Sequence, residues 1–89
     1  MGDIIAVKTI ILTHKAAKDL DALPAVARHS ITEALAAYAS EGRGDVKKLS
    51  GREGFRLRVG EYRVIFGDDG ETILAVYIGR RTSSTYART

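Results

Sequence analysis

Arginine side chains alternate with apolar side chains in the part of this 89-residue chain that has the strongest β-hairpin pattern. Arg56 and Arg58 precede Gly60-Glu61, and Arg63 follows this pair. Glycine at the first central position of a two-residue reversal favours a type II′ turn, which places Arg58 directly opposite Arg63. Like charges in directly opposed positions destabilise a sheet, whereas a phosphodiester would relieve their repulsion by accepting several charge-assisted hydrogen bonds. The arginine spacing therefore predicts a surface that binds a polyanion.

The open alternative is that each arginine is solvated on an exposed face, with Glu53 or Glu61 nearby. The net charge is +3, and the positive excess lies in the second half of the chain. Residues 46–89 hold 9 of the 14 Lys and Arg side chains but only 5 of the 11 Asp and Glu side chains. A charge of this size also suits simple solubility. Arginine nevertheless predominates in this half, and its planar guanidinium favours bidentate contacts with phosphate.

Other cationic and aromatic side chains could extend this surface. Arg80 and Arg81 follow the last predicted strand, and Tyr86 lies a few residues further on. Beside a cationic cleft a tyrosine can stack on a base or lend its hydroxyl group, although a tyrosine near a chain end is as often a packing anchor. Lys47 and Lys48 suit a solvated loop or a contact with an RNA backbone. We expect Arg80, Lys47 and Lys48 to extend the polyanion-binding surface.

Composition excludes several classes of chemistry. The chain has no cysteine, so it has no disulfide framework, thiol nucleophile or cysteine-based zinc site. Two histidines are too few for a histidine-only metal centre, and no Gly-x-x-x-x-Gly-Lys phosphate loop is present. No apolar run approaches the length of a membrane span, and residues 1–9 lack the features of a secretory signal. We expect a cytoplasmic protein that uses no metal and no cofactor.

The elements that must position the arginines follow from the apolar pattern. Residues 4–12 are rich in β-branched side chains and predict a strand, and Thr13 suits the N-cap of a following helix. Apolar residues then recur at helical spacing on both sides of Pro24, which predicts a helical hairpin whose second helix ends by Gly42. The apolar positions of the two helices are Ala16, Leu20, Leu23, Ala27, Ile31, Ala34, Leu35 and Tyr38.

From residue 55 the apolar pattern changes from a helical period to strict alternation. The predicted turn brings the apolar side chains of both strands to the face opposite the arginines, in the pairs Val59–Tyr62, Leu57–Val64 and Phe55–Phe66. Asp68-Asp69-Gly70 predicts another turn, and residues 72–78 predict an interior final strand. We therefore predict one domain over residues 1–89, of the α+β class. Its order is β-α-α-β-β-β, and its antiparallel sheet carries the helical hairpin on one face.

These motifs resemble the RelE/ParE superfamily of toxins from bacterial type II toxin–antitoxin systems. The resemblance covers nearly the whole chain and rests on the segments Lys48–Gly51, Phe55–Phe66 and Ile78–Arg81, on Tyr86 and on the β-α-α-β-β-β order. It implies a small toxin that a cognate antitoxin neutralises. RelE-like members cut mRNA in the ribosomal A site without a metal, whereas ParE-like members inhibit DNA gyrase.

The resemblance to the RNase branch implies a catalytic set, which is Arg56, Arg58, Arg63, Arg81 and Tyr86. Arg56 and Arg58 stand where a RelE-type toxin has two lysines that serve as base and charge stabiliser. Arg63 and Arg81 match arginines that hold the phosphate, and Tyr86 matches a tyrosine that orients the nucleotide. Arginine stays protonated at ordinary pH and is a poor general base. A weak or ribosome-dependent nuclease would follow, with Arg80, Lys47 and Lys48 as further RNA-binding residues.

The presence of the full basic set together with the terminal tyrosine favours the RNase branch. We expect a RelE-like, metal-independent endoribonuclease (an mRNA interferase) whose partners are a cognate antitoxin, the ribosome and mRNA. The alternatives are a ParE-like inhibitor of DNA gyrase and a non-toxic homologue that keeps only antitoxin binding. We expect the antitoxin to lay an amphipathic helix or an added strand over the helical hairpin and the sheet edge. An acidic antitoxin segment would shield the arginines.

Overall fold

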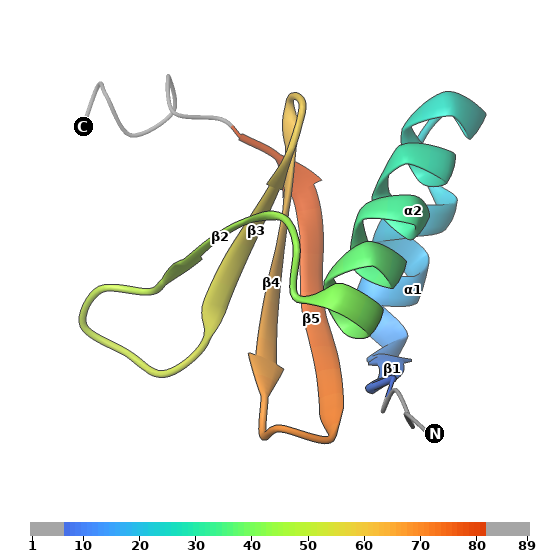
Figure 1. The fold of residues 1–89 in the computed structure, drawn as a ribbon. Coiled ribbons are helices and arrows are strands. Elements are labelled where there is room, and N and C mark those ends of the chain that lie inside the picture. The colour runs from blue at the N-terminus through green and yellow to red at the C-terminus, as the bar shows by residue number, and fades with distance from the viewer. Residues whose placement is uncertain (1–6, 82–89) are drawn as a thin grey trace, which may run out of the picture.

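Two helices cover one face of a five-stranded sheet in the computed structural model, which describes residues 7–81 (Figure 1). The elements follow in the order β1 (Thr9–Leu12), α1 (His14–Asp21), α2 (Ala25–Glu41), β2 (Asp45–Lys48), β3 (Phe55–Val59), β4 (Tyr62–Asp68) and β5 (Thr72–Arg80). This arrangement confirms the predicted α+β class and the helical hairpin on one face. Neither of the helices between residues 7 and 81 has the length and hydropathy of a transmembrane segment.

Local signals start and stop the helices where the sequence predicts. The Thr13 hydroxyl accepts a hydrogen bond from the Ala16 N–H at 3.1 Å and so caps α1. Pro24 is the N-cap residue of α2, where its missing N–H leaves no hydrogen bond unmade. Gly42 ends α2 with a left-handed φ of 72°, a conformation that glycine adopts without steric penalty. The predicted helical hairpin is therefore confirmed at both of its boundaries.

The strand order in the sheet is β1-β5-β4-β3-β2, and it departs from the prediction in one pairing. β1 lies parallel to β5, whereas every other neighbouring pair is antiparallel, so the sheet is mixed rather than wholly antiparallel. A parallel pair needs a long crossover connection, which the chain between β1 and β5 supplies. β1 begins at Thr9 rather than at residue 4, and residues 4–6 of the predicted strand lie outside the described part of the chain.

β2 is an edge strand where the sequence predicts a loop. Its four residues include a single apolar one, Val46, so the segment lacks the alternation that indicates a strand. Val46 lies opposite the buried Leu57 of β3, while the other three side chains of β2 are exposed. Charged residues, lysine above all, are common on edge strands because they discourage pairing with other chains. The prediction of a loop at Lys47 and Lys48 was therefore wrong, because a charged edge strand lacks the apolar alternation by which a strand is predicted.

The β3–β4 hairpin has the predicted turn and the predicted register. Gly60 has a φ of 59°, whereas Glu61, like every other non-glycine residue of the described chain, does not have a positive φ. This combination of signs fits a type II′ turn. The opposed residues around it are Val59–Tyr62, Arg58–Arg63, Leu57–Val64 and Phe55–Phe66, as predicted.

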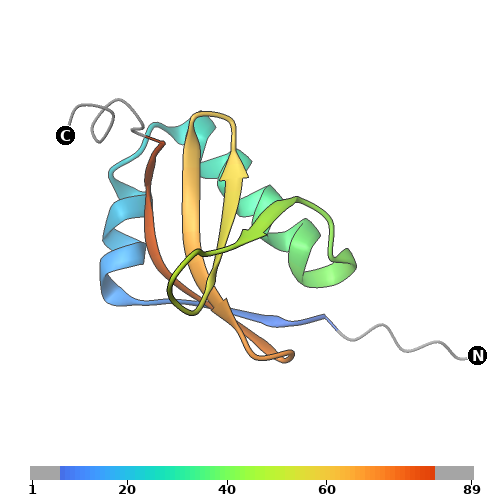
Figure 2. The ribbon, with the colours of Figure 1, turned by 90° about the vertical axis from the view of Figure 1, so that its left-hand side faces the viewer.

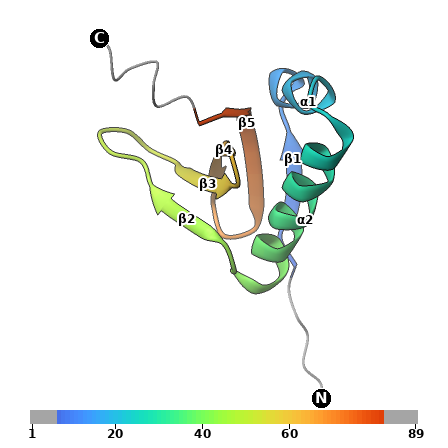
Figure 3. The same ribbon diagram turned by 90° about the horizontal axis from the view of Figure 1, so that it is seen from above.

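The hydrophobic core lies between the helices and the face of the sheet that they cover. The helices contribute Ala16, Ile31, Leu35 and Ala39, and the sheet contributes Leu57, Val64, Phe66, Ile73, Ala75 and Ile78. The other face of the sheet carries no helix; Figure 2 views it directly, with both helices behind the strands. Seen from above, both helices again lie on one side of the sheet (Figure 3). Strand alternation places the arginines on the uncovered face.

Candidate nucleic-acid interface

Strand register arranges the side chains of the uncovered face in two rows. One row crosses the sheet through Asp45, Arg58, Arg63 and Gly79, and the next crosses it through Lys47, Arg56, Ile65 and Tyr77. Directly opposed residues share a face, so the predicted clustering of three arginines is confirmed. We call the surface formed by Lys47, Arg56, Arg58 and Arg63 the arginine face.

The three arginines differ in whether a carboxylate or another acceptor lies near the guanidinium group. Arg58 is exposed, and its Nε lies 3.6 Å from Oδ2 of Asp45, whose side chain is 54% exposed. A surface ion pair of this kind contributes little to stability. Arg56 and Arg63 are half-buried, and Nη1 of Arg56 and Nε of Arg63 are inaccessible to solvent without an acceptor among residues 7–81. A buried donor without an acceptor is unfavourable, so Arg56 and Arg63 would gain from reorienting toward an oxygen acceptor that a ligand brings.

The loop between β2 and β3 forms one wall of a hollow beside the arginine face. A hydrogen bond of 2.9 Å from the Leu49 N–H to the Gly54 carbonyl closes this loop, and Gly51 adopts the left-handed φ of 74° that its turn requires. The hollow has a volume of about 520 Å³ and is lined by Leu49, Ser50, Arg52, Arg63, Ile65, Val76 and Tyr77. Cationic, aromatic and apolar side chains together are typical of sites that bind single-stranded nucleic acid.

Apolar side chains continue the uncovered face beyond the arginines. Ile11 of β1 and Leu74 of β5 are directly opposed, and they are 47% and 41% exposed. Val76 is 39% exposed on the same strand as Leu74. The uncovered face therefore has a cationic half over β2, β3 and β4 and an apolar half over β5 and β1.

Arg80 and Arg81 lie at the β3–β4 turn. Arg80 stands opposite Tyr62, which is on the helix-covered side of the sheet, and its guanidinium pairs with Glu61 and lies 5.4 Å from the centre of the Tyr62 ring. The backbone N–H of Arg81 donates to the Glu61 carbonyl at 2.7 Å, and its guanidinium donates to the Gly60 carbonyl at 3.2 Å. Both arginines thus brace the turn that sets the register of the arginine face.

The two lysines of β2 lie on opposite sides of the sheet. Lys47 stands opposite Arg56 and extends the arginine face, whereas Lys48 stands opposite Phe55, whose ring packs against the core. Tyr86, the predicted nucleotide-orienting residue, lies outside the described residues. The structure therefore brings together four of the predicted site residues, which are Lys47, Arg56, Arg58 and Arg63.

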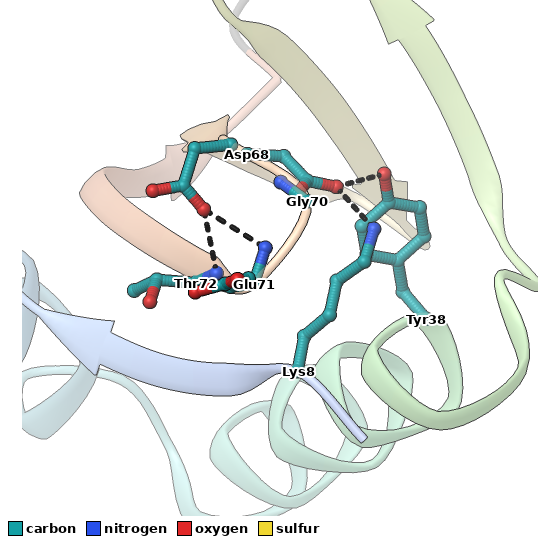
Figure 4. Close-up of polar contacts among 7 residues, drawn as sticks. Lys8, Tyr38, Asp68, Gly70, Glu71 and Thr72 are labelled. Atoms are coloured by element: carbon teal, nitrogen blue, oxygen red, sulfur yellow. Dashed lines mark hydrogen bonds and ion pairs between the residues drawn. The ribbon is translucent and has the colours of Figure 1, made fainter. Parts of the chain in front are cut away.

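Sequence reasoning missed a partly buried polar cluster at the other end of β4 (Figure 4). One carboxylate oxygen of Asp68 accepts hydrogen bonds from Nζ of Lys8 at 2.8 Å and from the Tyr38 hydroxyl at 2.7 Å. The hydrogen bond from Lys8 lowers the pKa of Asp68 although burial opposes it, while burial and the Asp68 contact raise the pKa of Tyr38 to about 12. No local pattern indicates this cluster, because Lys8 and Tyr38 lie 60 and 30 residues from Asp68 along the chain.

The predicted turn at Asp68-Asp69-Gly70 is confirmed, and both carboxylates help to form it. Oδ1 of Asp69 accepts hydrogen bonds from the N–H groups of Glu71 and Thr72 at 2.9 and 2.8 Å, and these bonds lower the pKa of Asp69. The second oxygen of Asp68 accepts from the Gly70 N–H at 2.9 Å. The two carboxylates are therefore held by separate hydrogen-bond donors of the turn.

With this geometry established, comparison with known proteins decides the family. A family model described as the ParE toxin of type II toxin–antitoxin systems (parDE) matches residues 10–84, which is most of the chain. This chain belongs to the ParE toxin family. No curated protein sequence matches it.

Solved structures place this ParE-family chain within the wider RelE/ParE superfamily. The toxin–antitoxin complex RelBE2 from Mycobacterium tuberculosis is similar, with a TM-score of 0.74 and 25% identity over 92% of this chain and 100% of that one. The archaeal RelE–RelB complex from Pyrococcus horikoshii has a TM-score of 0.71 and 23% identity, over 86% of this chain and 98% of that one. The chromosomal ParDE system of Pseudomonas aeruginosa has a TM-score of 0.66 and 21% identity, over 84% and 97%. The chain is therefore a toxin of the RelE/ParE superfamily, as its motifs predict.

Proposed function

We propose that this toxin is a metal-independent endoribonuclease that cuts mRNA on the ribosome. The observation that carries the proposal is the strand register, which places Arg58 directly opposite Arg63, with Arg56 and Lys47 in the next row of the same face. Directly opposed like charges destabilise a sheet, and an anion bound between them relieves the repulsion. A phosphodiester has the charge and the oxygen acceptors that these donors need.

RNA cleavage by the 2′-hydroxyl group requires the removal of a proton, stabilisation of a charged phosphorane and protonation of the leaving 5′-oxygen. Arg56, Arg58 and Arg63 suit the second of these tasks, because their charges persist at any physiological pH. They are poor bases for the first task for the same reason. Holding the ribose-phosphate in a reactive geometry and stabilising its charge would then supply most of the rate. This balance fits an enzyme that depends on the ribosome to orient its substrate.

Primer extension on translating mRNA after induction of the toxin tests the proposal. Wild-type toxin should generate new 5′ ends at codon positions, and a variant that combines Arg56→Ala with Arg63→Ala should not. Arg43→Ala is the matched control, because Arg43 is an exposed arginine paired with Glu41 in the α2–β2 loop. Unchanged cleavage by the double variant would refute the site assignment. Harmless expression of the wild type without its antitoxin would favour a non-toxic homologue.

Inhibition of DNA gyrase is the second candidate function, and the match to the ParE toxin family is the observation that favours it. The two candidates differ in target, since one needs a cationic site for RNA and the other needs a surface that fits gyrase. The apolar half of the uncovered face, with Ile11, Leu74 and Val76, would serve the second purpose. A supercoiling assay with purified gyrase separates the two. Inhibition without mRNA cleavage would establish the gyrase branch.

A cognate antitoxin is the partner that we propose for either function. The similar solved structures named above include RelBE2 and RelE–RelB, which are complexes of toxin and antitoxin. A hollow of about 420 Å³ between the start of α2 and the β3–β4 turn would receive an apolar antitoxin segment, because Val26 is 78% exposed there beside Val59. Val26→Asp should weaken co-purification with the antitoxin. Undiminished co-purification would place the contact elsewhere.

A further inference from the structure

Tyr77 occupies a position on the uncovered face that only a glycine two residues later allows. Tyr77 stands opposite Ile65 in the row of Arg56, and Gly79 stands opposite Arg63 in the next row. A Cβ atom on Gly79 would lie 2.7 Å from Cζ of Tyr77 and closer still to its hydroxyl oxygen. The tip of the Tyr77 ring therefore fills the space of the missing Gly79 side chain.

This placement brings a phenol hydroxyl into the row of Arg63. Directly opposed Cβ positions lie about 5 Å apart, so a group at the Gly79 position is within reach of an oxygen that also accepts from Arg63. Tyr77 and Arg63 line the same hollow of about 520 Å³. Tyr77 is half-buried, and no described residue forms a hydrogen bond with its hydroxyl. Within residues 7–81, the hydroxyl is therefore available to a ligand.

Two residues of α1, Lys15 and Asp19, contact the strand that carries Tyr77. Asp19 accepts a hydrogen bond from the Ile78 N–H at 3.1 Å, at an edge of β5 where β1 has already ended. Lys15 pairs with Asp19 at 2.9 Å, and its ammonium lies 5.1 Å from the centre of the Tyr77 ring. Burial raises the pKa of Asp19, but the bonds from Lys15 and Ile78 outweigh it and keep the pKa below its ordinary value. The contacts made by Lys15 and Asp19 hold the ring beside the arginine face.

We propose that Tyr77 is an RNA-contacting residue whose hydroxyl donates a hydrogen bond to the phosphodiester oxygen that Arg63 also binds. The inference rests on the proposed RNA-cleaving function and adds a residue to its binding site. A phenol suits this position because it donates a hydrogen bond without adding another positive charge to the arginine face. The neighbouring apolar side chains Ile65 and Val76 would lie under the adjoining base. No covalent step involves Tyr77.

The test measures the affinity of the full-length toxin for a fluorescent single-stranded RNA whose 2′-O-methyl riboses prevent cleavage. Tyr77→Phe keeps the ring and removes only the hydroxyl, so it should weaken binding about tenfold, as expected for a lost hydrogen bond to a charged group. Gly79→Ala should weaken binding to a similar extent, because the new methyl group displaces the ring tip. In the Tyr77→Phe background, Gly79→Ala should add no further loss.

Tyr62→Phe is the matched control, since Tyr62 lies on the helix-covered side of the same sheet and should leave RNA affinity unchanged. Urea unfolding of each variant checks that the fold is retained, and Tyr77→Phe suffices if Gly79→Ala is unstable. If Arg63→Ala weakens binding while Tyr77→Phe matches the wild type, the role of Tyr77 is wrong and the arginine site stands. If Arg63→Ala leaves binding unchanged, or the wild type does not bind the RNA, the Tyr77 proposal is wrong, while cleavage on the ribosome is decided separately by the primer-extension experiment.

Discussion

Arg63, like Arg56, has an environment better suited to phosphate than the paired arginines of the sheet. Its Nε is buried without an acceptor among the described residues, whereas Arg58 has Asp45 and Arg80 has Glu61 as an ion-pair partner. An arginine that already pairs with a carboxylate contributes less binding free energy to a phosphate contact, so its truncation weakens RNA binding less. Truncation of Arg63 should therefore weaken RNA binding more than truncation of Arg80 does.

Salt dependence provides a quantitative form of this prediction. Arg63→Ala should lower RNA affinity about tenfold at low salt and should reduce the slope of log affinity against log salt by about one, because one phosphate contact is lost. Fluorescence anisotropy titrations at several salt concentrations measure both quantities. Arg43→Ala, at an exposed loop position, should change neither. Salt-insensitive binding by the wild type would argue against a phosphate-contact surface.

Which arginines share a face could be predicted, because strand alternation and the turn at Gly60-Glu61 fix it locally. The lack of an acceptor for Nε of Arg63 among the described residues and the position of Tyr77 could not be predicted, since both depend on neighbouring strands. Gly79 supplies the only local signal for Tyr77, a glycine two residues after an aromatic residue in a strand. The cluster around Asp68 had no such signal, because its members come from three separate elements of the chain.

At the scale of elements, the β3–β4 hairpin depends on the positive φ of Gly60. A Cβ atom added at Gly60 would have nothing within 4 Å, so Gly60→Ala tests backbone conformation alone. The substitution should lower the free energy of unfolding by about 1 kcal/mol, because a left-handed conformation is unfavourable for alanine. Urea denaturation measures this change.

Gly67 of β4 provides the matched control for the hairpin. A Cβ at Gly67 also has open space around it, but Gly67 does not have a positive φ. Gly67→Ala should therefore leave stability unchanged or raise it slightly, because alanine restricts the unfolded chain more than glycine does. Equal losses from both substitutions would show that the turn conformation is not the cause.

The edge strand β2 shows why elements are harder to predict than faces. Its single apolar residue, Val46, lies opposite Leu57 of β3, and the local sequence of β2 does not indicate this pairing. The parallel pairing of β1 with β5 is a further consequence of tertiary packing, because residues 9–12 would suit either orientation as an isolated segment. Neither departure from the prediction changes the β3–β4 register that aligns Arg56, Arg58 and Arg63.

At the scale of the whole molecule, the Lys8–Tyr38–Asp68 cluster joins the region before β1, helix α2 and the end of β4. Only 7% of the Asp68 side chain is exposed, so Asp68→Asn should lower the free energy of unfolding by about 2 kcal/mol at pH 7. The folded-state pKa of Asp68 is below its ordinary value of 3.8, so ionised Asp68 stabilises the fold above about pH 4. That contribution is lost as the pH falls through the lowered pKa.

The difference in stability between wild type and Asp68→Asn should therefore be largest near neutral pH and should shrink in acid. Urea unfolding from pH 7 to pH 3 measures this dependence. Glu33→Gln is the control, since the Glu33 side chain is 71% exposed and should show little difference at any pH. A difference that stays constant down to pH 3 would mean that the charge of Asp68 does not stabilise the fold.

The pairing of β1 with β5 also constrains how the chain folds during synthesis. Among the strands of residues 7–81, the first to leave the ribosome pairs only with the last, so the helical hairpin and the β2–β4 segment emerge while that edge is still incomplete. Closing such a distant contact is slow compared with forming a hairpin. A ribosome that stalls before residue 72 would therefore hold a nascent chain that lacks both the completed sheet and the strand that carries Tyr77.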